Sequence, residues 1–228
     1  MRFSFLLFLV ATLAGCAMSE TPTPDYTVER TAADGAIEIR RYGDLLVAEV
    51  DARGGRSQAA GDGFRALADY IFGGNQASEK IAMTAPVLQA PSLPPSPASG
   101  ATDVPDVAAT ERWRVQFVMP PGYDMASLPK PRSRRVELRR LQPRRVAVLR
   151  FSGFNWESTL AEKRDRLMAW LKREGLDAAG PPTFAFYNPP WTPPFLKRNE
   201  VMVDLAEQAA AQPDAGTGAP LGADPDAG

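Results

Sequence analysis

The sequence lacks histidine altogether and contains a single cysteine in 228 residues. Without histidine, the chain has no Ser-His-Asp or Cys-His catalytic pair and no histidine-ligated metal site. One cysteine also excludes a disulfide framework and any cysteine-rich zinc site. The chain also has no large excess of positive or negative charge, because it contains 26 basic and 27 acidic residues. We therefore expect no nucleic-acid partner held by bulk positive charge.

The N-terminus has the pattern of a secretory signal peptide. A basic Arg2 precedes a short apolar run over residues 3–10, which is too short to span a bilayer stably. The following Leu13-Ala14-Gly15-Cys16 resembles a bacterial lipobox, in which the cysteine is lipidated and becomes the new N-terminus. We therefore predict a signal peptide over 1–15 and lipidation at Cys16; the alternative is an ordinary signal with an incidental cysteine.

A lipid anchor at Cys16 predicts a cell-envelope lipoprotein attached to a membrane. Ala17 rather than aspartate follows the cysteine, which by similarity to sorting rules favours the outer membrane, with the protein facing the periplasm. Residues 16–25 are polar and proline-containing, so they are expected to form a tether.

Composition divides the remaining chain. Residues 90–110 contain five prolines and few large apolar side chains, which predicts a disordered insertion. Residues 206–228 are rich in Ala, Pro, Gly and Asp and are expected to form a disordered tail. One folded domain over 26–205 remains, and we expect it to be monomeric.

The two parts of this domain resemble each other. Residues 37–50 align without gaps on residues 136–149, with identical Glu, Arg-Arg and Val-Ala positions. A helical pattern follows each segment; the second begins with a capping box at Thr159–Glu162. Strands are expected next over 80–88, 113–119, 183–187 and 200–205. The pattern predicts an α+β fold of duplicated β-α-β-β units, with two helices packed on a mostly antiparallel, strongly curved sheet.

Two segments carry a family resemblance. The first is Lys80-Ile81-Ala82-Met83-Thr84-Ala85-Pro86-Val87, and the second is the proline-rich aromatic loop that runs into Arg198-Asn199-Glu200-Val201. Both are similar to hallmarks of the SOUL / haem-binding protein family, and the resemblance covers 26–205. It implies a distorted β-barrel flanked by two helices and a binding function for haem or a similar tetrapyrrole.

A haem site needs an apolar groove and a cationic rim for the two propionates. The resemblance implicates the first helix as one groove wall, formed by Phe64, Leu67, Ala68 and Ile71. The loop residues Trp191 and Phe195, with Pro190, are expected to cover the ring, and Arg65, Lys197 and Arg198 to meet the propionates. The alternatives are that the helix stripe is simply a core face and that the loop is a plug at the barrel end.

Iron ligation is not expected. Some relatives are credited with a histidine ligand, which this chain cannot supply. The possible replacements are Met83, Tyr42, Tyr70 and Tyr187, and Met83 lies in a segment predicted to pack in the core. We predict a non-covalent, apolar association with haem as a possible cofactor, equally open to metal-free porphyrins or another planar amphiphile.

Two other functions compete with this one. An envelope lipoprotein could use its fold for protein or membrane contacts through an arginine cluster, Arg132, Arg134, Arg135, Arg139, Arg140, Arg144 and Arg145. The same residues alternate with apolar ones, as on a solvated strand face. An enzyme would have to rely on carboxylates such as Glu38, Glu49, Glu137 and Glu157. No pair of these has diagnostic spacing, and Glu38 and Glu137 suggest cross-strand ion pairs, so we predict a protein that is not an enzyme.

Overall fold

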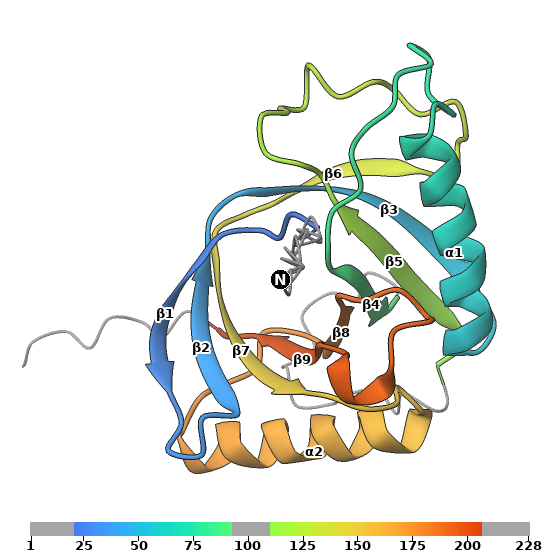
Figure 1. The fold of residues 1–228 in the computed structure, drawn as a ribbon. Coiled ribbons are helices and arrows are strands. Elements are labelled where there is room, and N and C mark those ends of the chain that lie inside the picture. Colours follow the sequence, from blue (N-terminus) through green and yellow to red (C-terminus); the bar gives the residue numbers. More distant parts are fainter. Residues whose placement is uncertain (1–20, 93–109, 207–228) are drawn as a thin grey trace, which may run out of the picture.

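The computed structural model describes residues 21–92 and 110–206. In this part of the chain, nine strands form one antiparallel sheet in the order β1-β2-β7-β9-β8-β4-β5-β3-β6. Figure 1 shows the sheet curled into a half-barrel with two helices on its outer side. The predicted α+β fold is confirmed. The strands are β1 (Tyr26–Thr31), β2 (Ile37–Tyr42), β3 (Leu45–Arg53), β4 (Val87–Pro91), β5 (Arg112–Val118), β6 (Glu137–Leu141), β7 (Arg144–Phe151), β8 (Thr183–Phe186) and β9 (Asn199–Asp204).

The strand order has an internal symmetry. If β2, β3, β4 and β5 are matched with β6, β7, β8 and β9, the order from β2 to β6 reads the same in both directions. The β4–β8 pairing lies at the centre of this symmetric run. The two matched sets of strands are joined along three antiparallel pairs, β2–β7, β4–β8 and β3–β6, while the sequence repeat itself stays a prediction.

Helix α1 (Arg56–Ile71) packs against β3 and β5. Its buried residues include Leu67, Tyr70 and Ile71. Gly63 allows the close approach, since a β-carbon there would lie only 2.6 Å from Val115 of β5. Gly73 follows the last turn of the helix in the left-handed conformation at φ 113°, which ends the helix.

Helix α2 (Glu157–Arg173) packs against β7 and β9 through Leu160, Leu167, Trp170 and Leu171. The predicted capping box is wrong, because the helix begins at Glu157, before Thr159, and its N-cap Trp156 makes no side-chain cap hydrogen bond. Neither helix in the described part of the chain is long and apolar enough to cross a membrane.

The segment around Met83 differs from the prediction. Residues 80–86 form no strand, and the strand expected from Lys80 begins only at Val87. The Asn75 side chain fixes the start of this segment by donating to the carbonyls of Tyr70 and Glu79. Strand β4 then runs to Pro91, two residues into the predicted insertion. Residues 93–109 of that insertion, the predicted signal peptide, Cys16 and most of the predicted tail lie outside the described residues.

Candidate functional site

Among the described residues, the six most exposed large apolar side chains are Phe72, just after α1, and five others on two loops, one between β7 and α2 (152–156) and one between β8 and β9 (187–198). Their exposed fractions range from 49% to 83%, with Trp191 the highest. Soluble proteins rarely leave several large apolar groups uncovered together, and such patches usually mark an interaction site. We call this set the aromatic loop surface: Phe154, Trp156, Trp191, Phe195 and Leu196.

Hydrogen bonds hold the two loops against each other. The Gly153 amide donates to the Pro194 carbonyl at 2.9 Å, and the Asn199 side chain donates to the Gly153 carbonyl at 3.1 Å. The rings of Phe154 and Trp156 stack nearly parallel, with centroids 4.7 Å apart. Prolines limit the backbone freedom of the second loop. The aromatic loop surface is therefore built on a fixed backbone.

This surface also adjoins the beginning of α1. Arg56, the first residue of that helix, donates to the Asn155 carbonyl in the β7–α2 loop at 2.8 Å. It also donates to the side chain of Gln89 in β4. The N-terminal end of α1 and the two aromatic loops are thus linked through direct hydrogen bonds.

The residues predicted to form one wall of the groove on α1 differ in their exposure. Leu67 and Ile71 are buried in the core cluster beneath α1, and Ala68 is half-buried. Phe64 keeps 40% of its surface exposed while one ring edge packs on Phe117 of β5. Arg65 is exposed and pairs with Asp62 on the same helix. Only Phe64 and Arg65 of this predicted set offer substantial surface to a ligand.

The predicted basic residues of the loop have different surroundings. Lys197 donates to the Pro190 carbonyl at 3.2 Å, which leaves two of its three ammonium protons available. Arg198 instead points into the protein, where it pairs with Glu200 at 2.8 Å and lies 3.9 Å over the Tyr187 ring. Lys197 is therefore the better placed of the two to meet an anionic group at the loop.

A buried polar network lies beneath this loop, which the sequence analysis did not anticipate. The fully buried Glu200 carboxylate accepts hydrogen bonds from Arg40, Arg198 and the Tyr187 hydroxyl, the last at 2.7 Å. Burial and the neighbouring Glu200 charge raise the pKa of Tyr187. Arg40 comes from β2, and Arg198 and Glu200 come from the Arg-Asn-Glu-Val segment, so this network joins β2 to β9.

Three of the four residues considered as iron ligands are engaged in hydrogen bonds within the protein. The hydroxyls of Tyr42 and Tyr70 are buried and bonded to Arg40 and the Pro129 carbonyl, and the hydroxyl of the half-buried Tyr187 is bonded to Glu200. The prediction that Met83 packs in the core is wrong, because it is 39% exposed. Within residues 21–92 and 110–206, no group of three or more metal-binding side chains occurs.

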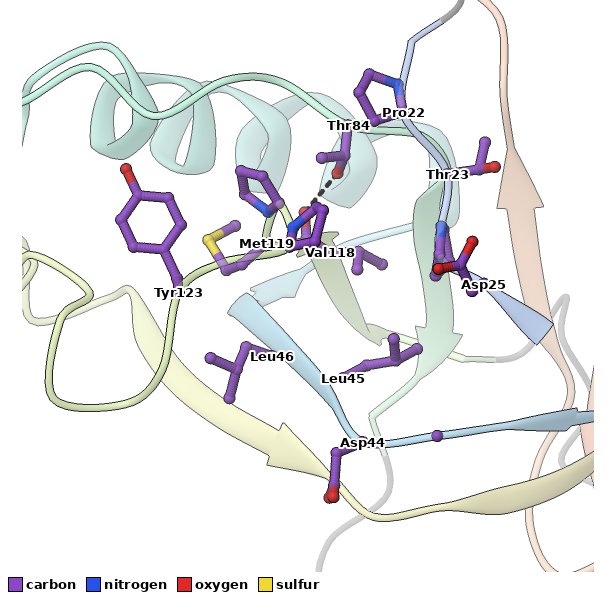
Figure 2. A pocket seen from close by; sticks show the side chains of 14 residues that line it. Pro22, Thr23, Asp25, Asp44, Leu45, Leu46, Thr84, Val118, Met119 and Tyr123 are labelled. Carbon is purple, nitrogen blue, oxygen red and sulfur yellow. Dashed lines mark hydrogen bonds between the residues drawn. The ribbon is translucent and has the colours of Figure 1, made fainter.

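A separate cavity of about 280 Å³ lies at the turn between β2 and β3. Figure 2 shows Leu45, Leu46 and Met119 between the N-terminal segment Pro22–Asp25 on one side and Tyr123 on the other. It contains none of the predicted site residues. The sequence analysis missed it because its walls come from four segments that are distant along the chain.

The arginine cluster is only partly available for contacts. Arg132, Arg139, Arg144 and Arg145 bond to Ser78, Glu49, Asp204 and Glu29, respectively. The others, Arg134, Arg135 and Arg140, are exposed and form no ion pair with another described residue. They lie on or just before the edge strand β6, which agrees with a solvated strand face.

Of the four carboxylates considered for catalysis, three form ion pairs with arginines and the fourth forms none with a described residue. Glu38 pairs with Arg40 of its own strand at 2.7 Å, so the predicted cross-strand pair is wrong. Glu49 pairs with Arg139, and Glu157 pairs with Arg56. Glu137 is exposed and faces Glu49 in register without an ion pair among the described residues. Three of the four carboxylates thus have a structural role as partners of arginines.

The fold defines a class, an α+β half-barrel with two external helices. The family model of the SOUL heme-binding protein matches residues 21–204, most of the chain. The chain belongs to the SOUL heme-binding protein family, as the resemblance implied. That family is one of binding proteins rather than of catalysts, and it makes haem or another tetrapyrrole the expected ligand class. A comparison with curated proteins gives no match.

Solved structures share the fold at low sequence identity. The EcmrR C-terminal domain is 9% identical with a TM-score of 0.51; the alignment covers 75% of this chain and 96% of that one. EcmrR in a DNA complex is also 9% identical with a TM-score of 0.53; it is matched over 74% of this chain, which spans only 56% of that chain. An uncharacterized conserved protein from Listeria innocua is 12% identical with a TM-score of 0.50, over 74% and 92% of the two chains. These likenesses establish the fold alone.

Proposed function

We propose that this chain is a monomeric cell-envelope protein that binds haem or a similar planar tetrapyrrole on the aromatic loop surface, without an imidazole ligand to iron. The single observation that carries the site is the exposure of five large apolar side chains on two hydrogen-bonded loops. The family supports the ligand class. The sequence around Cys16 supports attachment to the outer membrane on the periplasmic side.

Apolar contact is sufficient for such a site. A tetrapyrrole presents a flat face, and tryptophan and phenylalanine rings favour stacked or edge contacts with flat aromatic systems. Covering one large apolar side chain contributes about 1.5–3 kcal/mol. Two or three such contacts therefore give useful affinity without a bond to iron.

Charge completes the proposed site. Haem supplies a redox-active iron when bound, while the chain contributes apolar faces and a cation. The ammonium of Lys197, which donates only one hydrogen bond within the protein, would form an ion pair with one propionate. Arg198 holds Glu200 and would stay with it. On α1, Phe64 and Arg65 would add contacts if the ligand reaches beyond the N-terminal end of that helix.

Titration with haem and with metal-free protoporphyrin IX tests the proposal. We would use the full chain carrying Cys16→Ser and follow the Soret band together with tryptophan fluorescence. The double variant Trp191→Ala, Phe195→Ala should weaken binding by more than about a hundredfold, since two apolar contacts of about 1.5–3 kcal/mol each are lost. The control Phe72→Ala removes an exposed phenylalanine just after α1 and should leave affinity unchanged.

Two other outcomes carry information. If Phe64→Ala weakens binding more than the loop variants do, the ligand lies on α1 rather than on the loops. If neither tetrapyrrole changes the spectrum or the fluorescence, tetrapyrrole binding is rejected.

The second candidate is an envelope protein that contacts anionic lipid through exposed arginines. It is favoured by Arg134, Arg135 and Arg140, which form no ion pair with another described residue. Flotation of the Cys16→Ser chain with vesicles containing anionic lipid tests it, with Arg134→Gln, Arg135→Gln as the variant. Binding that survives the substitution would exclude a role for this cluster.

A further inference from the structure

The cavity at the β2–β3 turn has no part in the proposed tetrapyrrole site. We propose that it binds the alkyl chain of an amphiphile whose head group is cationic, such as an alkylammonium compound. The inference stands on the walls of the cavity, its size and the sign of the charge at its rim. It does not depend on tetrapyrrole binding.

Backbone and side-chain hydrogen bonds fix the walls. The Ala85 amide donates to the Pro22 carbonyl at 2.9 Å, which attaches the N-terminal segment to the loop before β4. The Met119 amide donates to the Leu46 carbonyl at 2.7 Å, which joins the end of β5 to β3. Figure 2 shows the hydrogen bond from the Thr84 hydroxyl to the Val118 carbonyl. The cavity is therefore a formed part of the fold.

Its interior is small and mostly apolar. The lining is dominated by apolar side chains: Pro22, Pro24, Leu45, Leu46, Val118, Met119, Pro120 and Pro121. A volume of about 280 Å³ lies just below the range typical of pockets for small molecules. A tetrapyrrole with its substituents does not fit such a space, whereas a flexible alkyl chain does.

The charges at the rim select the head group. Asp25 and Asp44 line the cavity and are exposed, and neither forms an ion pair or hydrogen bond with another described residue. No lysine or arginine lines it. The hydroxyls of Thr84 and Tyr123 are already donated to the Val118 carbonyl and to Glu79. Two carboxylates without an ion pair among the described residues therefore line the cavity, so a cation is attracted and an anion repelled.

A matched series of single-chain probes tests the inference by calorimetry on the Cys16→Ser chain, below the micelle concentration of each probe. We expect alkyltrimethylammonium ions to bind, and the carboxylates of equal chain length to bind at least tenfold more weakly. Affinity should rise by up to about fourfold per added methylene and level off when the cavity is full.

Variants locate the binding. Leu46→Trp and Pro120→Trp place bulk in the cavity, and either should abolish binding while the thermal transition shows that the protein is folded. Asp25→Asn with Asp44→Asn should weaken ammonium binding about threefold to tenfold, because the lost charges are exposed. Glu137→Gln, an exposed carboxylate on β6, is the matched control and should have no effect.

The outcomes separate the two proposals. Trp191→Ala with Phe195→Ala should leave ammonium binding unchanged even if it abolishes tetrapyrrole binding. The inference would be overturned if the carboxylate probes bound as tightly as the ammonium probes or more tightly. It would also be overturned if binding survived both Leu46→Trp and Pro120→Trp.

Discussion

Arg56 and Glu157 are the first residues of the two helices, and their side chains form an ion pair with a nitrogen–oxygen distance of 3.1 Å. Arg56 is buried, and it also donates to Gln89 at 3.0 Å and to the Asn155 carbonyl at 2.8 Å. Glu157 is about half exposed. One guanidinium thus connects α1, α2, the central strand β4 and the loop that carries Phe154 and Trp156.

The two partners should differ in their effect on stability. Arg56→Ala leaves a buried Gln89 side chain without its donor and removes buried side-chain packing, so it should cost about 2–4 kcal/mol. Glu157→Gln removes a half-exposed charge and should cost less than about 1 kcal/mol. Urea unfolding measures both. Equal losses would contradict the view that Arg56, rather than the ion pair, holds the elements together.

Gly63 should tolerate no side chain. In Gly63→Ala, the new methyl would meet Val115 at 2.6 Å, and overpacking of this kind costs about 1–3 kcal/mol. Gly61 lies in the same helix, and a β-carbon there meets nothing within 4 Å. Gly61→Ala should therefore stabilise the protein by roughly 0.5–1 kcal/mol. Thermal unfolding of the pair checks the prediction, and a destabilised Gly61→Ala together with a neutral Gly63→Ala would refute it.

Stability should fall in strongly alkaline solution. Burial raises the pKa of Tyr70 from 10.0 to about 12, so the folded state keeps a phenolic proton that the unfolded state releases. This contribution, about 2–3 kcal/mol, is complete below pH 10 and disappears as the pH rises to about 12. Denaturation midpoints across this range measure it.

Tyr70→Phe is the control for the alkaline transition. The phenylalanine cannot ionise, so the fall in stability above pH 10 should become shallower, although the raised pKa values of Tyr42 and Tyr187 retain part of it. An unchanged slope would show that Tyr70 does not keep its proton in the folded state.

Iron should matter little to tetrapyrrole affinity. The tyrosine hydroxyls considered as ligands are bonded within the protein, so metal-free protoporphyrin IX should bind within about threefold of haem. Absorbance spectra of the haem complex, oxidised and reduced, should lack the bands of a bis-ligated iron. A spectrum of that kind, lost in Met83→Leu, would instead identify Met83 as a ligand.

Cys16 should control where the protein resides. Lipidation anchors a domain durably because each buried methylene of the acyl chains contributes about 0.8 kcal/mol. Cys16→Ser should therefore move the protein from the membrane fraction to the soluble fraction. In a cell with two membranes, Ala17→Asp should retain the lipoprotein at the inner membrane. Unchanged fractionation of both variants would reject the lipidation at Cys16.

Much of the fold was predictable because local patterns carry it. The repeated segments at residues 37–50 and 136–149 contain β2 and β6, as the predicted β-α-β-β units require, and the helical stripe of Leu67 and Ile71 predicted α1. Boundaries were less predictable. Thr159 suggested a cap, but α2 starts before it, where Glu157 meets Arg56 from another part of the chain. Residues 80–86 alternate as a strand does, yet loop contacts through Asn75 determine their backbone.

The candidate site was predictable only in part. Trp191, Phe195 and Lys197 stand on an exposed loop, as a ligand-facing role requires, whereas Leu67 and Ile71 turn inward. Phe154 and Trp156 were missed, although two large aromatic residues in a turn outside any helical or strand period were a usable signal. The cavity at the β2–β3 turn left no sequence signal, since four distant segments form it.

The sequence by itself determined the class of secondary structure, the family and the excluded chemistry, because residue type, local periodicity and short motifs are properties of neighbouring positions. Only the tertiary structure decided which apolar residues remain at the surface. Whether Phe64 or Leu67 meets solvent depends on how α1 lies on β3 and β5, and whether Arg56 reaches Glu157 depends on bringing together residues 101 positions apart. Curvature of the sheet and close approach of its loops are cooperative properties of the whole chain, so no single segment contains them.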